Sequence, residues 1–228
     1  MCFSASVSFG LSATLATIGA VSLARNSSKP QRLFAAIPLV FAAQQAAEGM
    51  VWLTIDGSHA TLNWLAVRAF LGVALMVWPI WAPLALMLVE QNPVRRRALA
   101  ALTWAGGAVA LCALVLLARF GPVPHVAGHS IRYDYERSND AASHLFYLFA
   151  YVVPTVAPWF VSTRSQSRPL GILLLISLLS SAIVQRDALT SVWCFFAAVL
   201  SSLILLVVER HPGAAGSADP RQLSRDAP

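Results

Sequence analysis

Apolar residues in this chain gather in seven long runs, which short polar connections separate. A helix needs about 20 apolar residues to cross the hydrocarbon core of a bilayer, and runs of this order recur along the chain. None of them alternates as a transmembrane barrel strand does, so helices are the remaining way to pair their backbone amides. The pattern therefore predicts an all-α fold, an integral membrane bundle of seven transmembrane helices over Ser6–Ala24, Leu33–Ile55, Leu62–Val89, Ala98–Ala118, Ala142–Ser162, Leu170–Val184 and Leu189–Val208.

The basic residues of the connections predict the orientation of this bundle. Lys and Arg are enriched in loops that stay on the cytoplasmic side. One alternate set of connections carries nine basic residues, and the other set carries four. This difference places the N-terminus outside and the C-terminus in the cytoplasm. The nine are Arg25, Lys29, Arg32, Arg95, Arg96, Arg97, Arg164, Arg168 and Arg210, and the four are Arg119, Arg132, Arg137 and Arg186.

Composition agrees with a membrane protein and argues against a soluble one. The 228 residues are 57% hydrophobic and 11% charged, whereas about a quarter of the residues in soluble domains are charged. The net charge of +6 is explained by cytoplasmic loops, so we expect no nucleic-acid partner. Residues 1–210 form the predicted transmembrane domain, and residues 211–228, rich in Pro, Gly, Ala and Ser, form a disordered cytoplasmic tail.

Two charged residues fall inside predicted spans, at similar depth on consecutive antiparallel helices. Glu48 is eight residues before Asp56, roughly 12 Å below the outer surface, and Arg68 is six residues past Leu62, roughly 9 Å deep. A lone charge in hydrocarbon costs several kcal/mol, so such charges usually pair with an opposite charge or face a water-filled cavity. We therefore expect a contact between Glu48 and Arg68.

Other polar and aromatic residues of the outer half would join this pair in an outward-facing polar pocket. Gln44, Glu48 and Trp52 recur every four residues and so share one helix face. The same depth brings in side chains from the fifth and seventh spans. Together with Glu48 and Arg68, the predicted ligand-binding set is Gln44, Trp52, His144, Tyr147, Tyr151, Ser191 and Cys194. The alternative is purely structural, because polar side chains also join membrane helices by hydrogen bonds.

A metal site is a second hypothesis, based on the outer histidines. His125 and His129 would share a face if their segment were helical, and His144 could complete the three protein ligands that a catalytic zinc needs. Pro122, Pro124 and Gly128 argue against a helix there, so surface histidines without metal are the favoured interpretation. The sequence specifies no cofactor. A retinal protein is excluded because Lys29, in a predicted cytoplasmic loop, is the only lysine in the sequence.

The loop between the fourth and fifth spans, residues 120–140, is the one long connection. It reads "FGPVPHVAGHSIRYDYERSND", and loops of this length are often functional. Pro79, Pro83, Pro154 and Pro158 lie within the third and fifth spans, where proline frees a carbonyl and kinks a helix. Such kinks can open space for a pocket.

Four stretches resemble a known family: "MCFSASVSFG", "FAAIPLVFAAQQAAEGMVWL", "HLFYLFAYVVPTVAPWFVS" and "SVWCFFAAVLSSLI". They are similar to those of uncharacterised bacterial integral membrane proteins whose members typically open with Met-Cys-Phe-Ser-Ala. The resemblance covers about residues 1–210. It implies a multi-pass protein of the bacterial cytoplasmic (inner) membrane, and it brings no established activity.

The leading functional hypothesis is binding, sensing or transport of a small polar molecule or ion through the pocket around Glu48 and Arg68. One alternative is an intramembrane hydrolase, with or without a metal, that uses His144 and Glu48. Another is a membrane subunit whose charges contact a partner protein. The lipid bilayer is the one partner that the sequence requires, and the sequence leaves the oligomeric state open.

Overall fold

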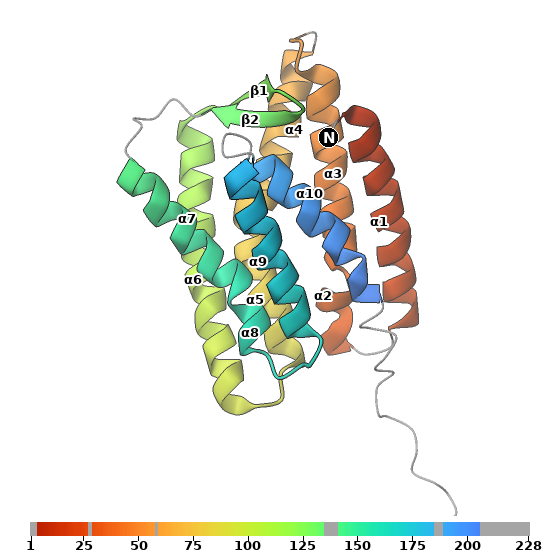
Figure 1. Ribbon diagram of the computed structural model, residues 1–228, viewed down its shortest axis with the longest axis vertical. Helices are drawn as coiled ribbons and strands as arrows, with labels where there is room; N and C mark the ends of the chain where they lie inside the picture. The colour runs from red at the N-terminus through yellow and green to blue at the C-terminus, as the bar shows by residue number, and fades with distance from the viewer. Residues whose placement is uncertain (1–3, 27–28, 58, 135–140, 185–188, 206–228) are drawn as a thin grey trace, which may run out of the picture.

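The computed structural model describes residues 4–26, 29–57, 59–134, 141–184 and 189–205, and of residues 141–147 and 184 it describes the backbone alone. The predicted tail lies outside these residues. Figure 1 shows an elongated bundle of helices with a small hairpin across one end. The elements are α1 (Ala5–Arg25), η1 (Lys29–Gln31), α2 (Arg32–Ala35), α3 (Ile37–Thr54), α4 (Ala60–Gly72), η2 (Val73–Val77), α5 (Trp78–Val89), α6 (Pro93–Arg119), β1 (Val123–Ala127), β2 (Ser130–Asp134), α7 (Ala141–Val156), α8 (Pro158–Val161), α9 (Ser167–Val184) and α10 (Leu189–Ser201).

Within the described residues, each of the seven predicted segments coincides with one helix or with two or three consecutive helices. In the part of the chain that the structure describes, four helical stretches are long and apolar enough to cross a membrane: Ala5–Arg25, Lys29–Thr54, Ala60–Val89 and Pro93–Arg119. Three shorter apolar helices follow, Leu148–Val161, Ser167–Ile183 and Leu189–Leu205. The chain is therefore mainly helical, with the apolar composition of a membrane protein.

The all-α prediction is wrong in one place, because the long connection holds an antiparallel β-hairpin. Ala127 pairs with Ser130 across a two-residue turn, whose first residue, Gly128, has a φ of +62°. Glycine is used at this position because L-residues rarely adopt positive φ there. Ile131 is fully buried, and the Tyr133 ring stacks on Phe70 with centroids 5.3 Å apart. The hairpin thus closes the end of the bundle at which α3 ends and α4 begins.

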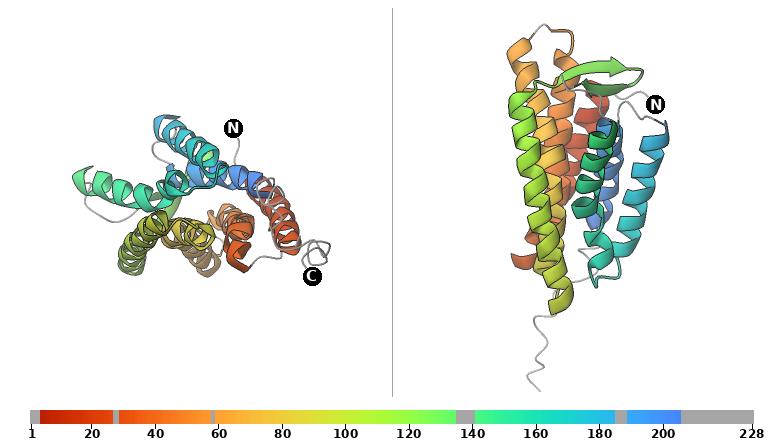
Figure 2. Two further views of the ribbon diagram at one scale, coloured as in Figure 1. Left: turned by 90° about the horizontal axis from the view of Figure 1, so that it is seen from below. Right: turned by 90° about the vertical axis from the view of Figure 1, so that its left-hand side faces the viewer.

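The helices pack around α3 and α5. Helix α3 contacts α1, α4 and α10, and α5 contacts α6 and α7; Figure 2 shows the same arrangement from below and from the side. Small residues allow close approach between membrane helices. At Gly106 of α6, a Cβ atom would lie 1.9 Å from the carbonyl oxygen of Pro79. This carbonyl has lost its usual intrahelical donor, since the residue four positions on is Pro83.

The predicted proline distortion appears in the third segment as the π-helical turn η2, which precedes Pro79. A π-turn pairs each carbonyl with the N–H five residues later. For Ala74 that residue is Pro79, which has no N–H. The hydroxyl of Tyr151 in α7 donates to the Ala74 carbonyl instead, at 2.6 Å. A hydrogen bond from a neighbouring helix thus satisfies the buried carbonyl of Ala74.

A second set of hydrogen bonds joins two turns at the opposite end from the hairpin. The Glu90 carboxylate, 5% exposed, accepts bonds from the Thr163 N–H at 2.7 Å, the Thr163 hydroxyl at 2.8 Å and the Asn92 N–H at 3.0 Å. Burial raises the pKa of Glu90, but its hydrogen bonds with Thr163, Asn92 and Ser162 outweigh this, so the pKa lies below its usual value. Arg95 also donates to the Val161 carbonyl at 2.9 Å. The α5–α6 and α8–α9 connections are therefore held together by polar contacts.

Candidate functional site

A buried polar cluster lies where α3 meets α10. Gln44 and Gln45 have no exposed surface, and Glu48 is 3% exposed. Glu48 follows Gln45 by three residues and Gln44 by four, so it lies next to both on the surface of α3. Ser191 and Cys194, three apart on α10, are also buried. We refer to these five residues as the polar cluster.

Hydrogen bonds from neutral groups hold the Glu48 side chain. The Ser191 hydroxyl donates to one carboxylate oxygen of Glu48, and the Gln45 amide donates to the other at 3.3 Å. Gln44 is fixed separately, because the Trp78 indole N–H donates to its carbonyl oxygen at 2.7 Å. Cys194 is buried on α10, one helical turn from Ser191. The cluster therefore joins α3 to both α5 and α10.

The predicted contact between Glu48 and Arg68 is wrong. Within the described residues, the ion pairs do not include Glu48, and the Arg68 guanidinium lies over the ring of Trp64, 4.0 Å from its centroid. Helix α4 buries Val67 and Phe70 instead. Arg68 is adjacent to Val67 and so points about 100° away from it around the helix, which separates it from Glu48 although the depths are similar.

Several buried polar atoms at and near the cluster have no hydrogen-bond partner among the described residues. They are Nε2 of Gln44, Oε1 of Gln45, and the indole Nε1 atoms of Trp52 and Trp193. A buried donor or acceptor without a partner costs about 1–3 kcal/mol. Water or a bound molecule usually satisfies such groups. This region is therefore suited to hold a molecule with polar atoms of its own.

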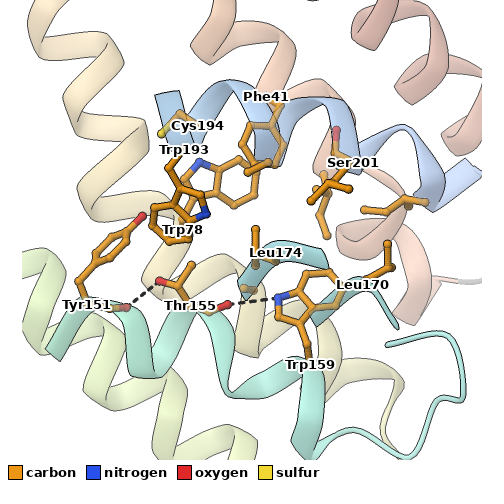
Figure 3. Close-up of a pocket in the computed structure, with 15 residues that line it drawn as sticks. Phe41, Trp78, Tyr151, Thr155, Trp159, Leu170, Leu174, Trp193, Cys194 and Ser201 are labelled. Carbon is orange, nitrogen blue, oxygen red and sulfur yellow. Dashed lines mark hydrogen bonds between the residues drawn. The ribbon is translucent and has the colours of Figure 1, made fainter. Parts of the chain in front are cut away.

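An apolar cavity of about 60 Å³ lies beside the polar cluster. Phe41, Trp78, Tyr151, Trp159 and Trp193 line it, and Figure 3 shows them reaching it from α3, α5, α7, α8 and α10. The other lining residues are Ile37, Ala82, Thr155, Leu170, Leu174, Cys194, Ala197, Leu200, Ser201 and Ile204. Two of these contacts connect the cavity to the polar cluster, because Cys194 belongs to both and Trp78 bonds to Gln44.

The Tyr151 side of the cavity is fixed by hydrogen bonds and ring contacts. The Tyr151 ring lies edge-on to the Trp193 ring, with centroids 5.7 Å apart. The Trp78 ring stacks on the Phe41 ring, with centroids 3.9 Å apart. The Thr155 hydroxyl donates to the Tyr151 carbonyl at 2.8 Å, as drawn in Figure 3. The lining is therefore held in place before any ligand enters.

The predicted site residues divide into three groups. Gln44, Glu48, Ser191 and Cys194 do meet in the polar cluster, and Tyr151 lines the cavity. Arg68 and Trp52 are not among the residues that line the cavity. His144 and Tyr147 lie in α7, outside the residues whose side chains are described. Sequence reasoning missed Phe41, Trp78 and Trp159, since aromatic residues in an apolar run give no signal that separates a cavity wall from core.

The histidine pair of the metal hypothesis falls on the hairpin. His125 is in β1 and His129 is in the turn, so the helical spacing that would bring both imidazoles to one face is absent. His125 lies 3.8 Å from the carboxylate of Asp134, which also receives Arg132 at 2.8 Å. Within the part of the chain that the structure describes, no three His, Cys, Asp or Glu side chains gather as metal ligands would.

Comparison with known proteins identifies a family and no characterised relative. Neither the curated proteins nor the solved structures contain a match to this chain. A family model does match, over residues 1–219, and it thus includes every helix and both strands described above. The chain therefore belongs to DUF6629, a family of unknown function.

Proposed function

We propose that this chain is a multi-pass protein of the bacterial cytoplasmic membrane, with seven spans and its N-terminus outside. The four long apolar helices support this. Two of the shorter helices have 17 residues each, Ser167–Ile183 and Leu189–Leu205. Each is about 25 Å long, close to the thickness of the hydrocarbon core, which is about 30 Å. In this orientation residues 1–210 form the membrane domain, residues 211–228 form a cytoplasmic tail, and the hairpin lies on the outer face.

We further infer that the protein binds a small molecule in the cavity beside the polar cluster, and that sensing or transport would depend on this binding. The observation that carries the proposal is an aromatic cavity that adjoins buried polar atoms without partners. Ligand sites commonly combine an apolar wall with a few polar groups that fix the orientation of the ligand. This arrangement differs from the predicted polar pocket, because most of the wall is carbon.

The expected ligand is compact and mainly apolar, with one group that accepts or donates a hydrogen bond. The Trp193 indole N–H is buried and unpaired on the wall of the cavity. A hydroxyl or carbonyl oxygen of the ligand would satisfy it, while the alkyl part of the ligand would contact Leu174, Leu200 and the aromatic rings.

The test uses 3,3-dimethylbutan-1-ol, a compact apolar molecule with one hydroxyl. The purified protein in lipid nanodiscs is titrated, and tryptophan fluorescence is recorded because Trp78, Trp159 and Trp193 are on the cavity wall. Empty nanodiscs correct for partition into lipid. We expect a saturable change for the native protein and its loss in Ala197→Phe, which places a ring in the cavity.

Ala105→Phe is the matched control, since Ala105 is exposed on α6 and does not line the cavity. This variant should bind as the native protein does. The proposal is abandoned if the native protein shows no saturable change, or if Ala197→Phe and Ala105→Phe bind the alcohol equally.

A further inference from the structure

Within the described part of the chain, the partners of the Glu48 carboxylate are all neutral groups. Ser191 and Gln45 are its hydrogen-bond donors, and Cys194 is buried one helical turn from Ser191 on α10. The cation nearest in depth, Arg68, is held over Trp64. Charged groups inside a membrane bundle usually pair with one another or mark a pathway for an ion or substrate. Glu48 is thus a counter-ion without a cation among the described side chains.

The cavity next to Glu48 has the composition of sites that recognise organic cations. Five aromatic side chains line it and none of its lining residues is charged. Aromatic rings attract ammonium groups, and this attraction is stronger where water is excluded. The carbonyl oxygen of Gln45, buried and unpaired, adds a further acceptor beside Glu48. A positive charge in the cavity would therefore meet the aromatic rings, while the Glu48 carboxylate and the Gln45 oxygen lie outside the lining.

We propose that the ligand of this cavity is a small organic cation, a substituted ammonium with apolar groups, and that Glu48 is its counter-ion. This proposal rests on the binding function proposed above and specifies its ligand class. The interaction between Glu48 and the ligand is electrostatic without direct contact, because Cys194 lines the cavity and Glu48 does not. The aromatic wall receives the alkyl groups of the cation.

Choline and 3,3-dimethylbutan-1-ol test this proposal, because they have the same shape and differ in a positive charge. Both are titrated against the native protein, Glu48→Gln and Glu48→Asp in nanodiscs. We expect Glu48→Gln to weaken choline binding at least tenfold and to leave binding of the neutral alcohol unchanged. Glu48→Asp, which keeps the charge, should retain most of the choline affinity.

Binding of the neutral alcohol separates the two proposals. If the native protein binds neither probe, the binding function itself fails. If it binds the alcohol, and Glu48→Gln binds choline as tightly as the native protein, only the cation proposal is overturned. If Glu48→Gln fails to bind the alcohol, ligand-observed NMR on the native protein tests whether choline and the alcohol compete for the cavity. Displacement of the bound alcohol by choline supports the proposal, and no displacement refutes it.

Discussion

Ser191 donates a hydrogen bond from α10 to the Glu48 carboxylate of α3. Replacing Ser191 with alanine leaves a buried acceptor without its donor, since Gln45 bonds to the other oxygen. We expect the free energy of unfolding to fall by about 1–3 kcal/mol, measured by denaturant titration in detergent micelles. Ser202→Ala is the control. Among the described residues its hydroxyl donates to the Val199 carbonyl, three residues earlier in the chain, so an equal loss in both variants would contradict the prediction.

Glu90 predicts a dependence of stability on pH. Its pKa is lowered in the folded protein by hydrogen bonds with Thr163 and Asn92, so the unfolded state binds more protons as the solution becomes acidic. This stabilisation is therefore complete above the unfolded pKa of about 4.3 and is lost as the pH falls through the lower folded pKa. Glu90→Gln should be less stable than the native protein at pH 7.

The measurement is the difference in unfolding free energy between the native protein and Glu90→Gln, from pH 7 to pH 3. We expect the difference to shrink at the acidic end, because protonation removes from native Glu90 the charge that the variant lacks throughout. A difference that stays constant or grows toward low pH would show that the carboxylate charge is not the stabilising feature.

At the scale of single residues the sequence brought together part of the polar set, Gln44, Glu48, Ser191 and Cys194, but it did not predict how these residues pair. Depth along a helix follows from residue number at 1.5 Å per residue, and this correctly brought Glu48 and Ser191 to the same level. The rotation of each helix about its axis depends on packing. Since α4 packs through Val67 and Phe70, Arg68 is directed to Trp64, and no pattern in one sequence fixes that angle.

Helix α6 crosses α5 closely at Gly106. An alanine Cβ there would approach the Pro79 carbonyl oxygen to 1.9 Å, and backbone atoms of a packed helix cannot move aside easily. Gly106→Ala should therefore lower the melting temperature by several degrees, as overpacking costs about 1–3 kcal/mol. Gly107→Ala is a strict control, because nothing lies within 4 Å of its Cβ position.

At Gly107 the substitution should be neutral or mildly stabilising, since alanine exceeds glycine in helix propensity by about 1 kcal/mol. Thermal unfolding of both variants in the same detergent makes the comparison. The close-contact interpretation fails if Gly106→Ala is as stable as Gly107→Ala.

Among the elements, the helices were predictable and the hairpin was not. Long apolar runs leave a membrane chain with few choices, and all seven predicted segments correspond to helices. The hairpin is too short to show a period, and Pro124 within β1 argues against a strand. Its stability derives from tertiary contacts, such as Tyr133 on Phe70. The proline kinks were expected. The hydrogen bond from Tyr151 to the Ala74 carbonyl of η2 was not, because the two residues are 77 positions apart in the sequence.

For the whole molecule, the two ends of the bundle differ in chemistry. The hairpin and the α3–α4 connection are at one end, and the Glu90 contacts with Thr163 are at the other (Figure 1). Glu48 is in the half of α3 nearer the hairpin, with Gln44 and Gln45 at the middle of this helix, whereas the cavity extends from Tyr151 toward Trp159 and Leu170. A molecule in the cavity would therefore lie deeper in the proposed membrane, on the cytoplasmic side of Glu48.

The proposed orientation makes a prediction about the whole chain, which thiol labelling can check. Val126 on the hairpin and Val94 at the start of α6 are 54% and 72% exposed, and they lie at opposite ends of the bundle. In a background with Cys2→Ser and Cys112→Ser, a membrane-impermeant maleimide added to intact spheroplasts should label Val126→Cys. It should label Val94→Cys only after permeabilisation, because that position faces the cytoplasm beside Arg95, Arg96 and Arg97. The reverse result would invert the proposed topology, and labelling of both sites in intact spheroplasts would show that the two ends are on the same side of the membrane.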